Sequence, residues 1–265
     1  MPTLTQHVVE TLSEFTGLVE AMRSGSTCVL WYRGCRDGSY PLVPTLYRHP
    51  DAAGIAELLE LEKQLMVRFR QRSVPYHTRE LKESWESLFF MQHFGVPTRL
   101  LDWTESPYIG LYFALADAEP GADAAVWALR PCEWNRHALG YMSHSGDILT
   151  PDDGALLGYR PASDPGFDLN TMNEDPVAVF GTHNSPRIVA QRGVFTVFGK
   201  STTPMETVYV DKNFPQDSLV KLVIPAAGVC ALLSAVLSIG VTDSTVFPDL
   251  DGVAREMRRM FRFKV

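Results

Sequence analysis

The sequence predicts a single α+β domain in which helices flank one sheet. Its 265 residues are 45% hydrophobic and 21% charged, an ordinary globular composition with enough chain for one large core. Short apolar segments typical of strands alternate irregularly with segments of helical periodicity, which argues against a regular strand–helix repeat. No repeat, low-complexity tract or linker divides the chain. We therefore expect one domain over residues 1–265.

The first half of the chain contains four expected helices and two expected strands. Helices are predicted over 11–23, 55–72, 84–95 and from Ser106 onward, where Ser106 is a natural N-cap and Pro107 suits the first helical position. Strands are predicted at "CVLWYRG" (28–34) and "TRLLDW" (98–103). A turn-rich loop over 36–51 follows the first of these strands.

The second half has a less regular pattern. Strands are expected at 124–130 and 220–225, and "RIVAQRGVFTVFG" (187–199) is interpreted as strand, turn and strand. Residues 131–185 are rich in Gly, Pro, Asp and Asn and predict a loop-rich, flexible insert that could hold a short helix. The apolar run 226–241 is short for a membrane span and predicts a buried helix, and a final helix begins near Pro248.

Composition excludes several classes of protein. The net charge of −7 disfavours nucleic acid as a partner, and the basic stretches 68–72 and 255–262 are interpreted as solvated helix faces. Cys28, Cys35, Cys132 and Cys230 match no zinc or redox spacing, and the N-terminus lacks a signal-peptide pattern. We expect a cytoplasmic protein with reduced thiols and no membrane contact.

Familiar catalytic motifs are missing from the sequence. It contains no GxGxxG, GxxxxGK[ST], GxSxG or HExxH pattern. Five histidines fall in expected loops at no metal-ligand spacing: His49, His77, His137, His144 and His183. The sequence therefore predicts no metal site.

An arginine and a glutamate are the first candidate pair. Arg33 ends a buried strand, and Gly34 after it would permit close approach of a backbone or ligand. An arginine there can hold a phosphate or carboxylate through its fork of donors. Glu62 falls on the apolar stripe of its helix, where a carboxylate either reaches the edge of the stripe or forms a buried pair. Arg33 is the expected partner.

The stretch "QHFGVPTRLLDW" (92–103) is the second candidate region. It crowds polar groups among apolar ones, just before a helix whose N-terminus could bind phosphate or ribose oxygens. A structural alternative makes Asp102 a capping group paired with Arg99, and His93 a packed neutral histidine. The candidate ligand-binding residues here are Gln92, His93, Thr98, Arg99, Asp102, Trp103, Thr104 and Tyr108. Trp103 or Tyr108 could stack on a ligand ring.

Gln191 is the third candidate. It lies near the end of an expected strand, just before Gly193, and could face either a site or the surface.

Together, "WYRG", "QHFGVPTRLLDWTESPYIGLYFAL", "RIVAQRGVFTV" and "VFPDLDGVAREM" resemble the FRG-domain family, named for its Phe/Tyr-Arg-Gly motif. The resemblance runs over about residues 15–262. It implies a bacterial or phage-borne protein with a role in toxin or phage-defence biology.

A more distant resemblance is to the ADP-ribosyltransferase superfamily. It implies a split mixed or antiparallel sheet, with Arg33 on an NAD phosphate or ribose and Asp102–Thr104 at the nicotinamide end. Gln191 would then occupy the place of the superfamily's catalytic glutamate. Gln191 is neutral, so Glu62 or Asp102 would have to supply the charge.

The resemblance implies an enzyme that transfers ADP-ribose from NAD or cleaves NAD, with NAD as substrate, no metal and a possible protein acceptor. The alternative is a non-catalytic module that senses a nucleotide-like small molecule or binds a protein.

Overall fold

The computed structural model describes residues 2–263, except 27, 78–80, 82, 143 and 183–184. In this part of the chain seven strands form one sheet in the order β1-β7-β4-β2-β3-β6-β5. The strands are β1 (Thr5–Val8), β2 (Trp31–Cys35), β3 (Leu100–Thr104), β4 (Ala124–Leu129), β5 (Val177–Val179), β6 (Gly193–Val197) and β7 (Leu219–Ile224). β1 runs parallel to β7 and the other neighbours are antiparallel, so the fold is the expected α+β domain.

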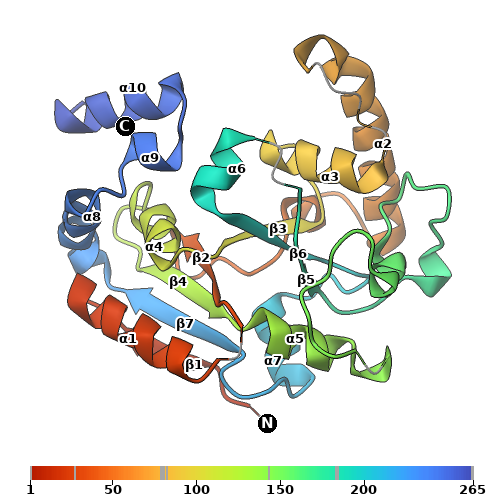
Figure 1. Ribbon diagram of the computed structural model, residues 1–265, viewed down its shortest axis with the longest axis horizontal. Helices are drawn as coiled ribbons and strands as arrows, with labels where there is room; N and C mark the ends of the chain where they lie inside the picture. The colour runs from red at the N-terminus through yellow and green to blue at the C-terminus, as the bar shows by residue number, and fades with distance from the viewer. Residues whose placement is uncertain are drawn as a thin grey trace.

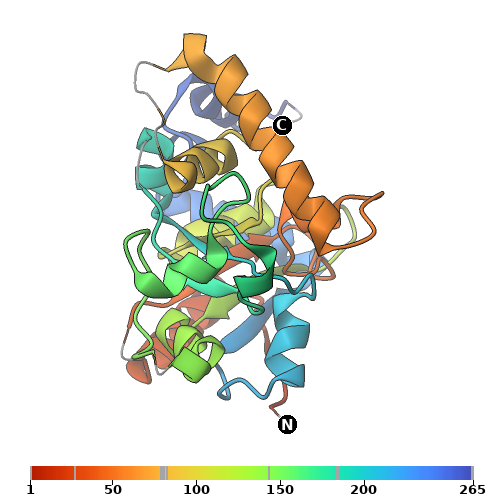
Figure 2. The same cartoon turned by 90° about the vertical axis from the view of Figure 1, so that its right-hand side faces the viewer.

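Helices cover both faces of the sheet (Figure 1). One face is packed by α1 (Leu12–Ser24), α4 (Pro107–Leu115) and α8 (Val229–Ser238). The other is packed by α2 (Ile55–Ser73), α3 (Ser84–His93), α5 (Pro131–Ala138) and α7 (Met205–Asp211). The short helices α6 (Pro186–Gln191) and α9 (Asp243–Val246) and the terminal helix α10 (Leu250–Met260) complete the described helices other than single 3₁₀ turns. Figure 2 shows α2 running along one side of the molecule.

The middle of the sheet is nearly divided. β2 pairs with β4 over all five of its residues, and β3 pairs with β6 over all five of its own. Between β2 and β3, however, only Tyr32 and Thr104 are paired. The two strands therefore diverge beyond that pair, as the expected split sheet requires.

Gly34 allows helix α4 to lie directly on β2. A Cβ atom at Gly34 would come within 2.2 Å of the Gly110 carbonyl oxygen and 2.4 Å of the Ala114 nitrogen. One at Gly110 would come within 2.9 Å of the Tyr32 Cβ. The glycine of "WYRG" is thus needed for close contact between helix and strand, rather than for approach of a ligand.

Residues 187–191 belong to the helix α6, so the expected strand there is wrong. Ser185 Oγ accepts a hydrogen bond from the Ile188 N–H at 3.2 Å, and Pro186 occupies the first turn of α6. This is the same Ser-Pro start that predicts α4 correctly. Arg192 then ends α6 in the left-handed region (φ 48°), and β6 begins at Gly193.

Residues 131–185 contain more structure than a loop-rich insert. They contain α5, 3₁₀ turns at Gly140–Met142, Gly154–Tyr159 and Leu169–Thr171, and the edge strand β5. Trp134 and Tyr159 are fully buried, and both donate hydrogen bonds to backbone carbonyls. The segment is therefore part of the core.

Two other expectations fail. Cys28 and Cys132 form a disulfide, with Cα atoms 6.4 Å apart, so these thiols are not reduced as expected. α8 buries only Leu232 and Val236, so it is half-buried rather than enclosed. No helix in the described residues is long and apolar enough to cross a membrane.

Candidate functional site

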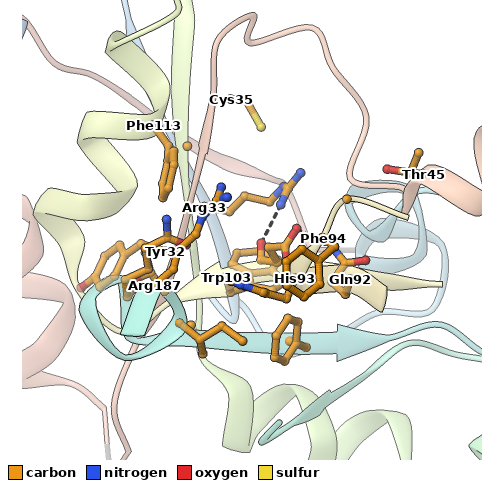
Figure 3. A pocket seen from close by; sticks show the side chains of 18 of the residues that line it. Tyr32, Arg33, Cys35, Thr45, Gln92, His93, Phe94, Trp103, Phe113 and Arg187 are labelled. Atoms are coloured by element: carbon orange, nitrogen blue, oxygen red, sulfur yellow. Dashed lines mark hydrogen bonds between the residues drawn. The ribbon is translucent and has the colours of Figure 1, made fainter. Parts of the chain in front are cut away.

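A cleft of about 990 Å³ opens where β2 and β3 diverge. Its walls are β2, the loop after it, the end of α3, β3, α6 and the start of α10. Figure 3 shows Arg33 above the strand that carries Trp103, with Gln92, His93 and Phe94 to one side and Tyr32, Phe113 and Arg187 to the other. Of the sequence-predicted residues, the cleft gathers Arg33, Gly34, Gln92, His93, Asp102, Trp103, Thr104 and Gln191.

Arg33 bridges the gap between the two diverging strands. Its Nη1 donates a hydrogen bond of 2.6 Å to the backbone carbonyl of Asp102 (Figure 3). The expected Arg33–Glu62 pair is therefore wrong. Arg33 is instead held at the cleft, with the rest of its guanidinium able to meet a ligand.

Glu62 pairs with Arg99, and both side chains are fully buried away from the cleft. Arg99 Nε lies 3.1 Å from Glu62 Oε1, while Glu62 Oε2 accepts the Ala162 N–H at 2.8 Å. Arg99 also donates to the carbonyls of Tyr159 and Arg160. The pair therefore joins α2, the start of β3 and the 159–162 segment. The sequence suggested that Arg99 and Glu62 belong to the ligand site, but neither residue lines the cleft.

Asp102 presents an exposed carboxylate whose position is set by two neighbours. Gln92 Nε2 donates to Asp102 Oδ2 at 2.7 Å. The side-chain oxygen of Gln92, Oε1, accepts a hydrogen bond from Thr98 Oγ1 at 2.5 Å. Thr98 Oγ1 in turn accepts a hydrogen bond from the Leu100 N–H at 3.1 Å. Because Thr98 is a donor to one end of the Gln92 amide, the other end must be the NH₂ group that meets Asp102. Thr98 itself is fully buried and acts only through Gln92.

Trp103 and Thr104 line the cleft but are already engaged. The Trp103 indole is nearly buried and donates to Thr196 Oγ1 at 3.1 Å. Thr104 Oγ1 donates to the Gln191 carbonyl at 2.6 Å and accepts the Ser106 N–H. Tyr108 lies outside the cleft, where its hydroxyl is 3.1 Å from Thr16 Oγ1 and its ring packs near Phe15. It cannot stack on a ligand there.

Gln191 reaches the cleft from the end of α6 rather than from a strand. Its Nε2 donates to the Val246 carbonyl at 3.1 Å, which ties α6 to the C-terminal helices. Because Gln191 lies on a helix, the alternation of faces along a strand does not decide its direction.

His93 is half-buried beside the cleft, with Nδ1 3.4 Å from Ser185 Oγ. Burial lowers the pKa of His93, the charge of Arg187 lowers it further, and Asp102 opposes this. His93 is therefore neutral at pH 7, so that one ring nitrogen donates a hydrogen bond and the other accepts one.

Sequence reasoning missed several residues of the cleft wall. Arg48 is the last residue of the 3₁₀ turn Thr45–Arg48, which follows β2. Burial lowers the pKa of Arg48, and the neighbouring charge of Arg33 lowers it further. Arg187 on α6 has a pKa lowered by burial and raised by the nearby carboxylates of Asp249 and Asp102. The other missed members include Arg36, Tyr40 and Phe94, of which Phe94 is 60% exposed. They come from loops, helix ends and a helix mistaken for a strand, where periodicity gives no signal.

The cleft thus combines arginines with one oriented carboxylate. The charge of Arg33 lowers the pKa of Arg48, an effect that an anionic ligand would relieve. Exposed Phe94 offers a ring for stacking in place of Tyr108. No group of three or more His, Cys, Asp or Glu within the described residues could hold a metal, and His183 lies outside them.

One family profile, that of the FRG domain, matches residues 29–123. This match supports the resemblance to the FRG-domain family for that part of the chain. The matched segment begins two residues before β2 and ends just before β4, so it is shorter than the resemblance over 15–262. It contains Arg33, Gln92 and Asp102. Searches of curated proteins and of solved structures returned no match.

Proposed function

We propose that the cleft binds a nucleotide of the NAD class and that Asp102 acts on its glycosidic bond, giving ADP-ribose transfer or NAD cleavage. The single observation that carries this is the exposed Asp102 carboxylate, held by the Gln92–Thr98 pair in a cleft with Arg33, Arg48 and Arg187. An oriented carboxylate among cations suits a substrate that is anionic at one end and develops positive charge at the other.

The phosphates would lie against Arg33 and Arg48. Arginine is suited to phosphate oxygens because its planar fork can donate two parallel hydrogen bonds. Arg33 is held by the Asp102 carbonyl and by an interaction with the Cys35 thiol, and its other N–H groups would donate to the ligand. Phe94 or Tyr40 would stack on a base or nicotinamide ring.

The chemical step would use Asp102. As the bond between nicotinamide and ribose breaks, its electron pair leaves with nicotinamide and the ribose C1′ becomes electron-poor. Asp102 would stabilise that charge. Water or a protein acceptor would then attack C1′, and the proton that this nucleophile loses would pass to solvent. Gln191 would not take this role, because its amide is bonded to Val246 and carries no charge. A setting in toxin or phage-defence biology remains part of the proposal.

A second candidate is a non-catalytic nucleotide sensor. It is favoured by the engagement of Gln191 and Thr104 in bonds within the protein, since Gln191 stands where the distant superfamily resemblance implies a catalytic glutamate.

A thermal-shift series separates the two. NAD, ADP-ribose, nicotinamide and AMP are added singly to the wild-type protein, since a ligand that binds only the folded state raises Tm. We expect NAD and ADP-ribose to raise Tm, and Arg48→Ala to reduce that rise. Persistent stabilisation by NAD without any nicotinamide release would favour the sensor, and no shift with any nucleotide would refute both.

A further inference from the structure

The terminal helix α10 lies at the periphery of the molecule, beyond α9 (Figure 1). It packs on the protein through its polar side. Arg259 pairs with the buried Asp243 at 2.8 Å, and Glu256 Oε2 accepts hydrogen bonds from Thr242 Oγ1 and the Ser244 N–H. Gly252 lies so close to Phe247 that a Cβ atom would meet its carbonyl oxygen at 1.9 Å.

The apolar side of α10 consequently faces solvent. Leu250, Val253, Met257 and Met260 are 85%, 43%, 55% and 68% exposed. Their spacing of three, four and three residues places them in one stripe along the helix. Phe261, which is 65% exposed, extends the stripe at its C-terminal end. A contiguous apolar stripe of this kind marks an interaction surface.

We propose that this stripe binds the same stripe of a second copy of the chain, with the two α10 helices antiparallel across a two-fold axis. The spacing three-four-three reads the same in both directions, so Leu250 would meet Met260 of the partner subunit and Val253 would meet Met257 of the partner subunit. A two-fold interface requires such a self-complementary surface.

The charges beside the stripe favour this occupant. Asp251 and Arg258 are both exposed and lie seven residues apart, hence on the same flank of the helix. Antiparallel pairing would bring Asp251 against the partner's Arg258, twice in the dimer. A parallel pair would place this flank of the two helices on opposite sides of the interface, where Asp251 and Arg258 would not meet. An anionic lipid surface suits the arrangement less well, because Asp251 flanks the stripe and the whole chain carries a charge of −7.

The dimer would also complete the rim of the cleft. Pro248, Asp249 and Asp251, at the start of α10, line the cleft mouth. The partner's Arg258 would therefore add a positive charge beside that mouth, from the second copy.

Sedimentation velocity over a range of protein concentrations tests this directly. The wild-type chain is expected to show a monomer–dimer equilibrium that Met257→Glu shifts at least tenfold toward monomer. Val67→Glu is the matched control, because Val67 is an exposed apolar residue (57%) on a different helix, α2, and should leave the equilibrium unchanged. Circular dichroism confirms that both variants are folded.

A charge exchange tests the orientation. Asp251→Arg and Arg258→Asp should each weaken the dimer, and the double variant should recover it. A monomer at every concentration, a dimer indifferent to Met257→Glu, or no recovery in the double variant would overturn the proposal. So would a protein that stays monomeric but sediments with phosphatidylglycerol vesicles only when Met257 is intact.

Discussion

Gln92 and Asp102 come from different elements and are joined side chain to side chain, Nε2 to Oδ2, at 2.7 Å. Gln92 lies near the end of α3 and Asp102 within β3. Thr98, between them in sequence, fixes the amide from its other end. This chain of bonds explains three of the polar residues within "QHFGVPTRLLDW": Gln92 and Asp102 line the cleft, and the buried Thr98 holds Gln92 in place.

Thr98→Val should reduce turnover without abolishing it. Valine keeps the volume of threonine but cannot donate to the Gln92 carbonyl, so the amide can turn and Asp102 loses its fixed partner. It also leaves the Leu100 N–H without its acceptor, so we expect a loss of about 1–3 kcal/mol in the free energy of unfolding. Steady-state kinetics should show a lower kcat with little change in KM.

Thr98→Ser is the matched control for that variant. Serine retains the hydroxyl, so kcat should return toward the wild-type value. A purely structural role for Thr98 would instead give a Thr98→Val protein of lower Tm and unchanged kcat.

Arg99→Ala should destabilise the fold far more than Arg33→Ala. Removing Arg99 leaves Glu62 buried without its partner, which typically costs about 3–5 kcal/mol. Removing Arg33 deletes one hydrogen bond at the edge of the cleft, a loss of about 1 kcal/mol. Urea denaturation gives both free energies of unfolding. Equal losses for the two variants would contradict this assignment of the ion pair.

Gly34→Ala should cost about 3 kcal/mol of stability. Its new methyl group would collide with backbone atoms of α4, which cannot move aside as a flexible side chain can. Gly54→Ala is a suitable control, because nothing lies within 4 Å of a Cβ atom there. Thermal denaturation of the two variants checks this, and a Gly34→Ala protein as stable as the control would be inconsistent with close packing of α4 on β2.

The pKa of His93 predicts a specific dependence of stability on pH. Because the folded-state pKa lies below the ordinary value of 6.5, the unfolded chain binds more protons between the two values. The contribution of His93 to stability is therefore complete above pH 6.5 and is lost as the pH falls toward the folded pKa. His93→Gln should lose less stability than wild type between pH 7.5 and pH 5.5. The same loss in both proteins would rule out this role.

The sequence predicted the elements that have strong local signals. Ser106-Pro107 predicted the start of α4, and the segments 28–34 and 220–225 predicted the buried strands β2 and β7. α6 was missed because its apolar residues resemble those of a strand, although Ser185-Pro186 carried the start signal. A helix of six residues is too short for its period to outweigh β-type composition.

The long-range pairs could not be predicted in the same way. A buried cationic partner was expected for Glu62, and the structure shows one. Both Arg33 and Arg99 lie in or beside predicted strands, however, and periodicity does not say which of the two contacts α2. The cleft also draws Arg48 and Arg187 from segments far apart in sequence. Their approach depends on the divergence of β2 and β3, a property of strand pairing that no local pattern encodes.

The central claim is that Asp102 acts on the glycosidic bond of a nucleotide held in the cleft. The most direct test is nicotinamide release from NAD, followed by chromatography, for wild type, Asp102→Asn and the control Asp211→Asn on α7. Asparagine keeps the size of Asp102 and can still accept the Gln92 hydrogen bond, so Tm should hardly change. We expect wild type and Asp211→Asn to release nicotinamide over many turnovers. Asp102→Asn should still bind NAD, but it should release nicotinamide at least a hundredfold more slowly. Equal rates for wild type and Asp102→Asn, or no release by the wild-type protein with any acceptor, would contradict the account.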